Sequence, residues 1–151
     1  MPPASRSAAV LVAFAVALSA TALRAQTAAV SGDPGVLTIH SAPAGQELDP
    51  ASDAATTLAV TTTGPNQKIV ARLDAPLPDG ITLTIQLGAP SGAISRGRVR
   101  LATTDQELVV AIPTAGTHAG LAIVYTLEAT VRAGPLPTTA RAVVISVVDG
   151  T

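Results

Sequence analysis

The sequence predicts an all-β protein, an antiparallel β-sandwich of about seven to eight strands preceded by a signal-peptide helix. Three observations support this fold class. Short segments alternate apolar and polar residues with a period of two. Turn-forming Pro, Gly, Asn and Asp separate these segments at short intervals. After the first 25 residues, no segment shows a capped helical period of apolar residues.

The first 25 residues have the order of a secretory signal peptide. Arg6 gives a positive start, residues 8–18 (AAVLVAFAVAL) are an unbroken apolar run, and small residues follow. The stretch ALRAQ predicts cleavage between Ala25 and Gln26, with a cut after Ala22 as the alternative. A membrane anchor is the competing interpretation, but a spanning helix needs about 20 apolar residues. We therefore predict cleavage and no stable membrane insertion afterwards.

The chain that remains after cleavage has the size and composition of one exported domain. It keeps 126 of the 151 residues, with seven basic and ten acidic side chains because Arg6 and Arg24 leave with the signal peptide. This mildly acidic balance argues against a nucleic-acid partner. There is no cysteine, so the domain must be stable without disulfides. We expect the protein in the periplasm, at the cell surface or outside the cell.

The domain layout follows from the turn signals. Residues 26–35 predict a flexible lead-in, and residues 36–149 predict a single β-sandwich domain. The predicted strands are residues 36–41, 56–63, 67–74, 81–87, 98–102, 106–112, 121–132 and 138–148. The clearest is 81–87 (ITLTIQL), which alternates strictly. The predicted loops include 42–54, the Gly- and Ser-containing connection 88–97, and 113–120.

The strand 121–132 (LAIVYTLEATVR) assigns its side chains to two faces. Leu121, Ile123, Tyr125 and Leu127 form the predicted core face, and Ala122, Val124, Thr126 and Glu128 form the outward face. Tyr125 is the only aromatic residue after the predicted signal peptide, so the core consists of aliphatic side chains.

The two strands 98–102 and 106–112 predict a hairpin around Thr103 and Thr104. In this pairing Arg100 faces Glu107 and Val99 faces Leu108, and both strands then have one apolar face. The alternative is a basic stripe for an acidic polymer, because residues 96, 98 and 100 are all arginine and share one strand face.

The residue types present predict a protein that is not an enzyme and has no cofactor. No nucleophile, base or metal set assembles from the sequence. His40, in the first predicted strand, and His118, in a loop, are too few for a zinc site. Glu47, Asp49 and Asp53 in the loop 42–54 are the best calcium candidates. Their spacing is not that of an EF-hand, so a solvated acidic loop is favoured and no metal is predicted.

The outward residues of the last two predicted strands indicate an interaction surface. Ala122, Val124 and Thr126 are small and uncharged, and the segment 141–148 (RAVVISVV) is apolar in both phases, with Val144 and Val148 in the outward phase. A strand that is apolar on both faces is usually central in a sheet or covered by another element. Exposed apolar strand surface marks sites of association. We therefore predict a protein partner, either a second copy or another surface subunit.

The stretches GLAIVYTLEATVRAG and ARAVVISVV resemble bacterial fimbrial and spore-coat-type exported surface subunits. The resemblance implies an immunoglobulin-like sandwich that accepts a strand from the N-terminal extension of a neighbour. The corresponding segment here, residues 26–32, is short and weakly apolar, and the usual pilin disulfide is absent.

The expected function is that of a non-enzymatic structural or assembly subunit of the cell exterior. The alternative is a monomeric periplasmic binding or accessory module that uses its long loops.

Overall fold

The computed structural model describes residues 25–40, 46–133 and 139–151. In these residues the chain forms β-strands and one short 3-10 helix. The elements are β1 (Thr27–Ser31), β2 (Ala51–Thr62), β3 (Gln67–Leu73), β4 (Ile81–Leu87), β5 (Ile94–Ser95), β6 (Arg98–Arg100), β7 (Gln106–Ile112), β8 (Gly116–Ala129), η1 (Val131–Ala133) and β9 (Val143–Asp149). The predicted all-β class is thereby confirmed, while residues 1–24 of the predicted signal peptide lie outside the described residues.

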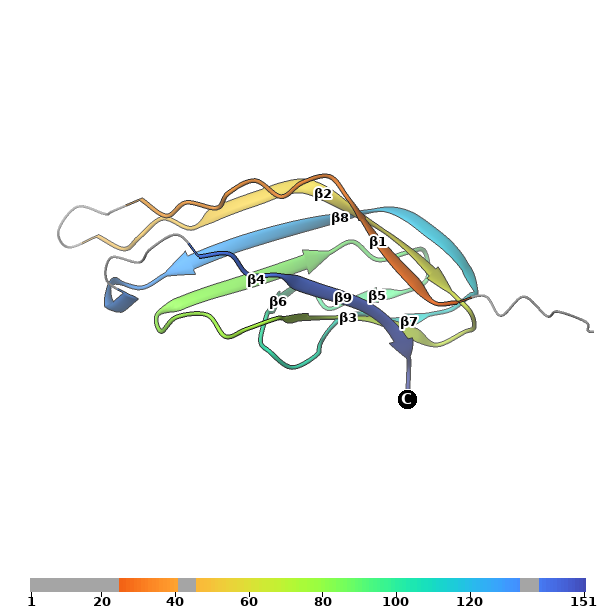
Figure 1. Ribbon diagram of the computed structural model, residues 1–151. Helices are drawn as coiled ribbons and strands as arrows, with labels where there is room; N and C mark the ends of the chain where they lie inside the picture. The colour runs from red at the N-terminus through yellow and green to blue at the C-terminus, as the bar shows by residue number, and fades with distance from the viewer. Residues whose placement is uncertain (1–24, 41–45, 134–138) are drawn as a thin grey trace, which may run out of the picture.

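The strands form two antiparallel sheets that pack face to face (Figure 1). Sheet A has the order β1-β2-β8-β4-β6, and sheet B has the order β5-β7-β3-β9. Each sheet therefore contains strands from both halves of the chain. Within the described residues, no helix is long and apolar enough to cross a membrane.

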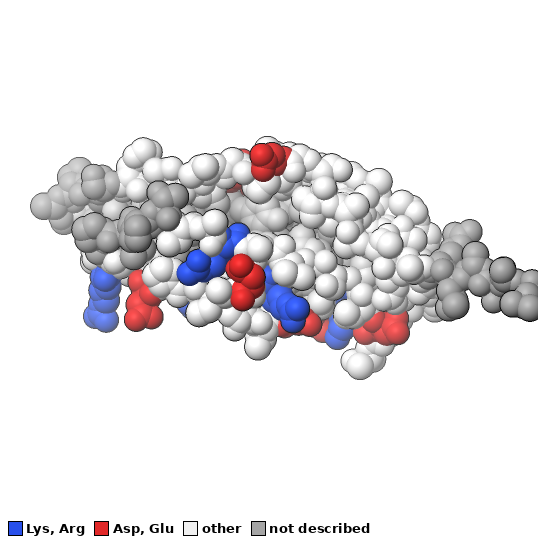
Figure 2. Space-filling model, in the orientation of Figure 1, with Lys and Arg blue, Asp and Glu red and all other residues white. Residues whose placement is uncertain are grey.

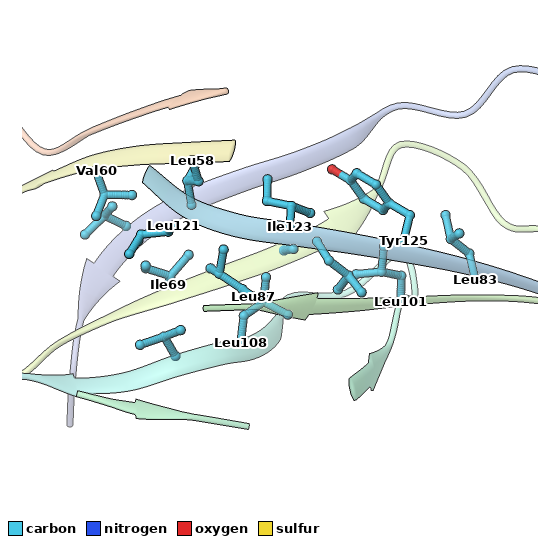
Figure 3. Packing of buried hydrophobic residues seen from close by; sticks show 14 of the residues in the cluster. Leu58, Val60, Ile69, Leu83, Leu87, Leu101, Leu108, Leu121, Ile123 and Tyr125 are labelled. Atoms are coloured by element: carbon cyan, nitrogen blue, oxygen red, sulfur yellow. The ribbon is translucent and has the colours of Figure 1, made fainter. Parts of the chain in front are cut away.

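One aliphatic core fills the space between the sheets (Figure 3). Its largest fully buried hydrophobic side chains come from both layers and are Leu58, Ile69, Ile85, Leu87, Leu108, Ile112 and Ile123. Burial of apolar surface stabilises a fold by about 25 cal/mol per Å². Because the chain has no cysteine, this burial replaces the disulfides that many small exported domains use.

Strand β8 lies between β2 and β4, and most of its side chains point to the predicted faces of the sheet. Leu121, Ile123 and Tyr125 are buried. Thr126, however, belongs to the predicted outward face, outside the core, and it is only 3% exposed. It pairs with Ser52 on β2 and Thr84 on β4, so neighbours lie on both sides of it. The Ser52 and Thr126 hydroxyl oxygens are 3.1 Å apart, and this hydrogen bond replaces the water expected there.

The N-terminal part of the domain differs from the prediction. Residues 36–40 are not a strand, and Ser41 lies outside the described residues. The first strand is instead β1, inside the segment predicted as a flexible lead-in, and it pairs with β2 from Thr27 to Ser31. The folded domain therefore begins near residue 27. The reason is tertiary, since TAAVS gains its strand partners from residues 57–61, far along the chain.

The predicted hairpin between 98–102 and 106–112 is wrong. β6 pairs with β4 in sheet A, where Arg100 lies opposite Thr84. β7 belongs to sheet B, between β3 and β5. The chain crosses between the sheets after β6, because the Leu101 amide donates to Leu83 O in sheet A and Leu73 of sheet B donates to Ala102 O. An alternating pattern is satisfied by either pairing, so it cannot select the partner strand.

Two predicted loops are partly strand, and the last strand is placed differently from the prediction. The loop 42–54 ends inside β2, and the loop 113–120 contains the start of β8. These Ala-, Thr- and Gly-rich stretches lack an apolar pattern, yet β2 and β8 pair along most of their length.

The last strand is predicted as central or covered. It is β9, an edge strand of sheet B.

Candidate functional site

Figure 2 shows charged side chains mainly along the lower side of the molecule, with an acidic group above, on the side of sheet A. On sheet B, Glu107 accepts from Lys68 Nζ at 2.9 Å and from Arg96 Nη2 at 3.0 Å. The hydrogen bond from Lys68, followed by that from Arg96, holds the pKa of Glu107 below its usual range. Glu107 thus joins β7 to β3 and to the segment after β5, whereas the predicted pairing placed it opposite Arg100. This face therefore has a network of opposite charges.

The outward face of sheet A has a broad uncharged area over three adjacent strands. We define the small-residue face as a set of outward side chains of β1, β2 and β8, namely Thr27, Ala29, Ser31, Thr57, Ala59, Thr61, Thr117, Ala122 and Val124. All but Val124 lie next to one another in the register of these strands, and Val124 follows Ala122 on the same face of β8. All nine are exposed or half-buried. The facing hydroxyl oxygens of Thr61 and Thr117 are 3.3 Å apart. This face has no ionisable group to desolvate.

Charge returns at the β6 side of the same sheet. Arg98 and Arg100 lie on β6, and Arg98 Nη1 is 3.7 Å from Glu128 Oε1 at the end of β8. The arginines predicted as a possible basic stripe are therefore divided, because Arg96 pairs with Glu107 on sheet B. The small-residue face is bounded by the Arg98–Glu128 ion pair on one side.

The predicted interaction residues lie in two separate places. Ala122 and Val124 belong to the small-residue face, while Thr126 is buried beside them. Val144 and Val148 lie on β9 of sheet B, opposite Arg72 and Lys68 of β3. The structure therefore divides the predicted face between sheet A and the edge of sheet B.

The calcium candidates are not brought together. Glu47 and Asp49 are both exposed in the loop before β2. Asp53 lies within β2, where its Oδ1 accepts from the Ala55 amide at 3.1 Å and its Oδ2 from the Gly35 amide at 3.4 Å. In the described part of the chain, no three His, Cys, Asp or Glu side chains form a group that could hold a metal ion.

The two histidines are placed differently from the prediction. His40 is exposed outside any strand, and His118 is in β8, where its Nε2 lies 3.4 Å from Thr62 Oγ1. The two predicted positions, a strand for His40 and a loop for His118, are therefore exchanged. Among the described residues, neither histidine lies in a group that could hold a metal.

A pocket of about 340 Å³ lies at one end of the sandwich. The turn before β4 and the segment after β6 line it, and its polar side chains are Asp79, Arg100 and Thr103. One carboxylate beside a permanently charged guanidinium supplies no nucleophile and base pair. The pocket therefore offers less for function than the two surfaces.

The predicted cleavage site adjoins the folded domain. Ala25 is exposed. Gln26 Nε2 donates to Asp149 Oδ1 at 2.9 Å, next to the bond from Gln67 Nε2 at 2.8 Å. The residue predicted as the new N-terminus is thus attached to the end of β9.

No known family model matches the chain, and no curated protein is significantly similar to it. The function must therefore be argued from the surfaces of the fold. Sequence reasoning missed the β1 and β2 parts of the small-residue face. Their signal is the run of Ala, Thr and Ser in the outward phase of both strands.

Proposed function

We propose that the protein is a non-enzymatic exported β-sandwich that serves as a structural or assembly subunit of the cell exterior. The observation that carries this proposal is the small-residue face, an exposed area without charge over three neighbouring strands. Burying it in a contact desolvates no ionised group. Ala loses no side-chain entropy on burial, and short side chains let a partner approach the sheet closely. Sheet B, with its ion pairs, is suited to face water.

Export and family are part of the same proposal. The charged, apolar and small-residue order of residues 1–25 supports removal of a signal peptide at Ala25. Two antiparallel sheets with strands from both chain halves support an immunoglobulin-like architecture. The strand order differs from the constant-type order, so the likeness is one of architecture.

The first experiment measures the mass of the exported protein in solution over a range of concentrations. We expect Ala122→Lys to fold and to lose assembled mass, because an ammonium group buried in a contact without a partner is costly. The matched control is Thr82→Lys, which is on the same sheet and opposite Glu128, outside the small-residue face. A wild-type protein that stays monomeric at all concentrations, alone and with cell-envelope extract, would contradict the proposal. That result would favour the alternative, a monomeric binding module that uses its long loops.

Export is tested separately. Mass spectrometry of the secreted chain is expected to find an N-terminus at Gln26, or at Leu23 for the alternative cut. Recovery of the uncut chain from the membrane fraction would contradict this part.

A further inference from the structure

We propose that a second copy of this chain binds at β9. The β9 strands of the two copies pair antiparallel about a two-fold axis and join the two copies of sheet B. The two four-stranded sheets then form one continuous sheet of about eight strands, within the usual range for sheets. This inference rests on the proposed assembly function and names the partner and the contact. The small-residue face is a different surface on the other sheet, so the two can be tested apart.

The four edge strands of the sandwich differ in how well they are protected against pairing. β5 has two residues, β6 has three with two arginines, and β1 has five small residues. β9 has seven residues, is free of Pro, and has no charge before its last residue, Asp149. It pairs with β3 over its whole length without a bulge. A long regular apolar edge is a template for another strand. Within the described residues, β9 lacks the Pro, bulges and mid-strand charges that usually prevent pairing, and β1 of sheet A passes close to it.

The hydrogen-bond pattern shows which backbone groups of β9 are free. The Asp74 amide donates to Ala142 O at 3.0 Å, and the Gly150 amide donates to Asn66 O at 2.7 Å. Residues of an antiparallel strand direct their N–H and C=O groups alternately to one side and the other. Even-numbered residues of β9 therefore bond to β3. The groups of Val143, Ile145, Val147 and Asp149 are directed to the open edge, which no strand of the described residues pairs (Figure 1).

The sequence of β9 is complementary to itself in one register. When Ile145 lies opposite Ile145 of the second copy, Val143 lies opposite Val147, and odd residues face odd residues as the free groups require. In the same register Arg141 comes opposite Asp149, so each copy offers one cation and one anion. A register centred on Ser146 also places odd residues opposite odd ones, but it puts the Asp149 carboxylate opposite Val143, which offers no cation. The Ile145-centred register is therefore the one we propose.

The side chains of β9 gain cover from such a partner on both faces. Val144 is 38% exposed on the outward face, and Val148 is half-buried there. On the inward face Val143 and Ile145 are half-buried and already pack against the core. An added strand extends the apolar interior past the present edge of sheet B. This explains why the segment is apolar in both phases although it is not central in its own sheet.

The first test uses disulfide cross-linking in the full-length protein, purified after export. The chain has no cysteine, so Ile145→Cys introduces a single thiol. In the proposed register the two Cα atoms are about 5.5 Å apart, a separation that a disulfide can span. We expect a covalent dimer under mild oxidation. The matched control is Thr104→Cys, an exposed residue outside both surfaces, which we expect to remain uncrosslinked at the same concentration. Ala122→Cys, made in parallel, reports on the small-residue face.

The second test keeps the core residues of β9 unchanged. In the proposed register Val144 lies opposite Ser146 of the second copy. V144E/S146E places like charges together twice, and we expect it to weaken the dimer by about tenfold or more. V144E/S146K places opposite charges together and is expected to restore the affinity to within about threefold of the wild type. Sedimentation at several concentrations gives the dissociation constants, and circular dichroism confirms folding.

The outcomes separate this inference from the proposed function. Efficient cross-linking of Ala122→Cys with none of Ile145→Cys would keep the assembly function and overturn the β9 contact. Equal weakening of the dimer by the two charge variants would also overturn the β9 contact. A protein that is monomeric by itself, as the wild type and in every variant, would overturn the β9 contact, and one that also stays monomeric with cell-envelope extract would overturn both.

Discussion

The single tyrosine reports on the interior of the sandwich. Tyr125 is 7% exposed, and burial, followed by the negative charge of Asp53, raises the pKa of its hydroxyl above the usual value. Figure 3 shows its ring beside Ile123 among the aliphatic core residues. Tyr125 is the one tyrosine of the chain, so changes in tyrosinate absorbance come from this residue.

We expect the Tyr125 absorbance to titrate above about pH 10, the ordinary value for tyrosine. Because the folded pKa is raised, the neutral hydroxyl stabilises the fold fully below the unfolded pKa. That contribution is lost as pH rises through the folded pKa. Tyr125→Phe removes this dependence of stability on alkaline pH. Asp53→Asn lowers the midpoint of the Tyr125 titration in the folded protein. This decrease is smaller than the decrease caused by unfolding the protein, because burial is the larger cause of the raised pKa. A midpoint at or below the ordinary value would contradict the buried placement.

Thr126 and Ile123 test the two faces of β8. Ile123→Ala is expected to lower the free energy of unfolding by about 2–5 kcal/mol, because it opens a cavity in the core. Thr126→Ala should cost about 1–2 kcal/mol, since Thr126 is buried and its hydroxyl bonds to Ser52. The exposed control Thr57→Ala on the same sheet should stay within about 0.5 kcal/mol. Urea denaturation measures the free energy of unfolding of all three variants. If Thr126→Ala and Thr57→Ala lowered it equally, the outward face of β8 would be solvated at Thr126.

Among the elements, β7 shows how pairing with a neighbour introduces bulges into a strand whose sequence alternates. Its register against β3 shifts twice, between Gln67 and Ile69 and again before Val70, so β7 holds extra residues. Ala111 lies in the first shift with a φ of 56°, in the left-handed region. Such bulges re-aim side chains and bend the strand. The pattern in QELVVAI contains no sign of them, because bulges depend on the partner strand.

The left-handed backbone at Ala111 leads to a prediction for the β7 bulge. An L-residue with a Cβ pays about 1–2 kcal/mol in this region, whereas glycine does not. Glycine also loses more entropy on folding, so Ala111→Gly should raise the free energy of unfolding by about 0.5 kcal/mol. Ala111→Val should lower it by more than about 1 kcal/mol, since β-branched residues avoid this conformation. Thermal and urea unfolding give both values, and a stabilising Ala111→Val would contradict the assignment.

The strands that sequence reasoning located best are those with a continuous apolar core face. The predicted strand 81–87 coincides with β4, and 106–112 coincides with β7. The strands that it shortened or missed are β1, the two-residue β5 and the outer ends of β2 and β8, and most of these stretches are rich in Ala, Thr, Ser and Gly. Small side chains have little preference for either face, so only their hydrogen-bond partners determine that they are strand.

At the scale of the whole molecule, β1 closes sheet A. It covers the edge of β2 from Thr57 to Thr61, and Ala28 packs against the core. Gly32 ends the strand with a φ of 90°, and a Cβ there would collide with the Ala55 carbonyl. The N-terminal segment is therefore part of the fold.

Deleting residues 27–31 should lower the melting temperature and cause association that increases with concentration. The reason is that β2, with 12 residues, becomes an open edge. The control Ala29→Lys keeps the pairing and changes only an outward side chain, so we expect an unchanged melting temperature. Differential scanning calorimetry and light scattering measure the two effects. A truncated chain that melts with the wild type would show that β1 contributes nothing to the domain.

Sequence patterns alone were enough for the fold class, most strands, the aliphatic core and the uncharged outward residues of β8, because period-two burial and turn chemistry are local properties. The absence of cysteine likewise required a core that is stable by burial. Only the tertiary structure decided which strands pair, since one alternating pattern fits several partners. That pairing moved Glu107 away from Arg100, buried Thr126, and placed the apolar last strand at an open edge of sheet B. Surfaces formed by several strands depend on pairing between distant segments, and local patterns contain no information about it.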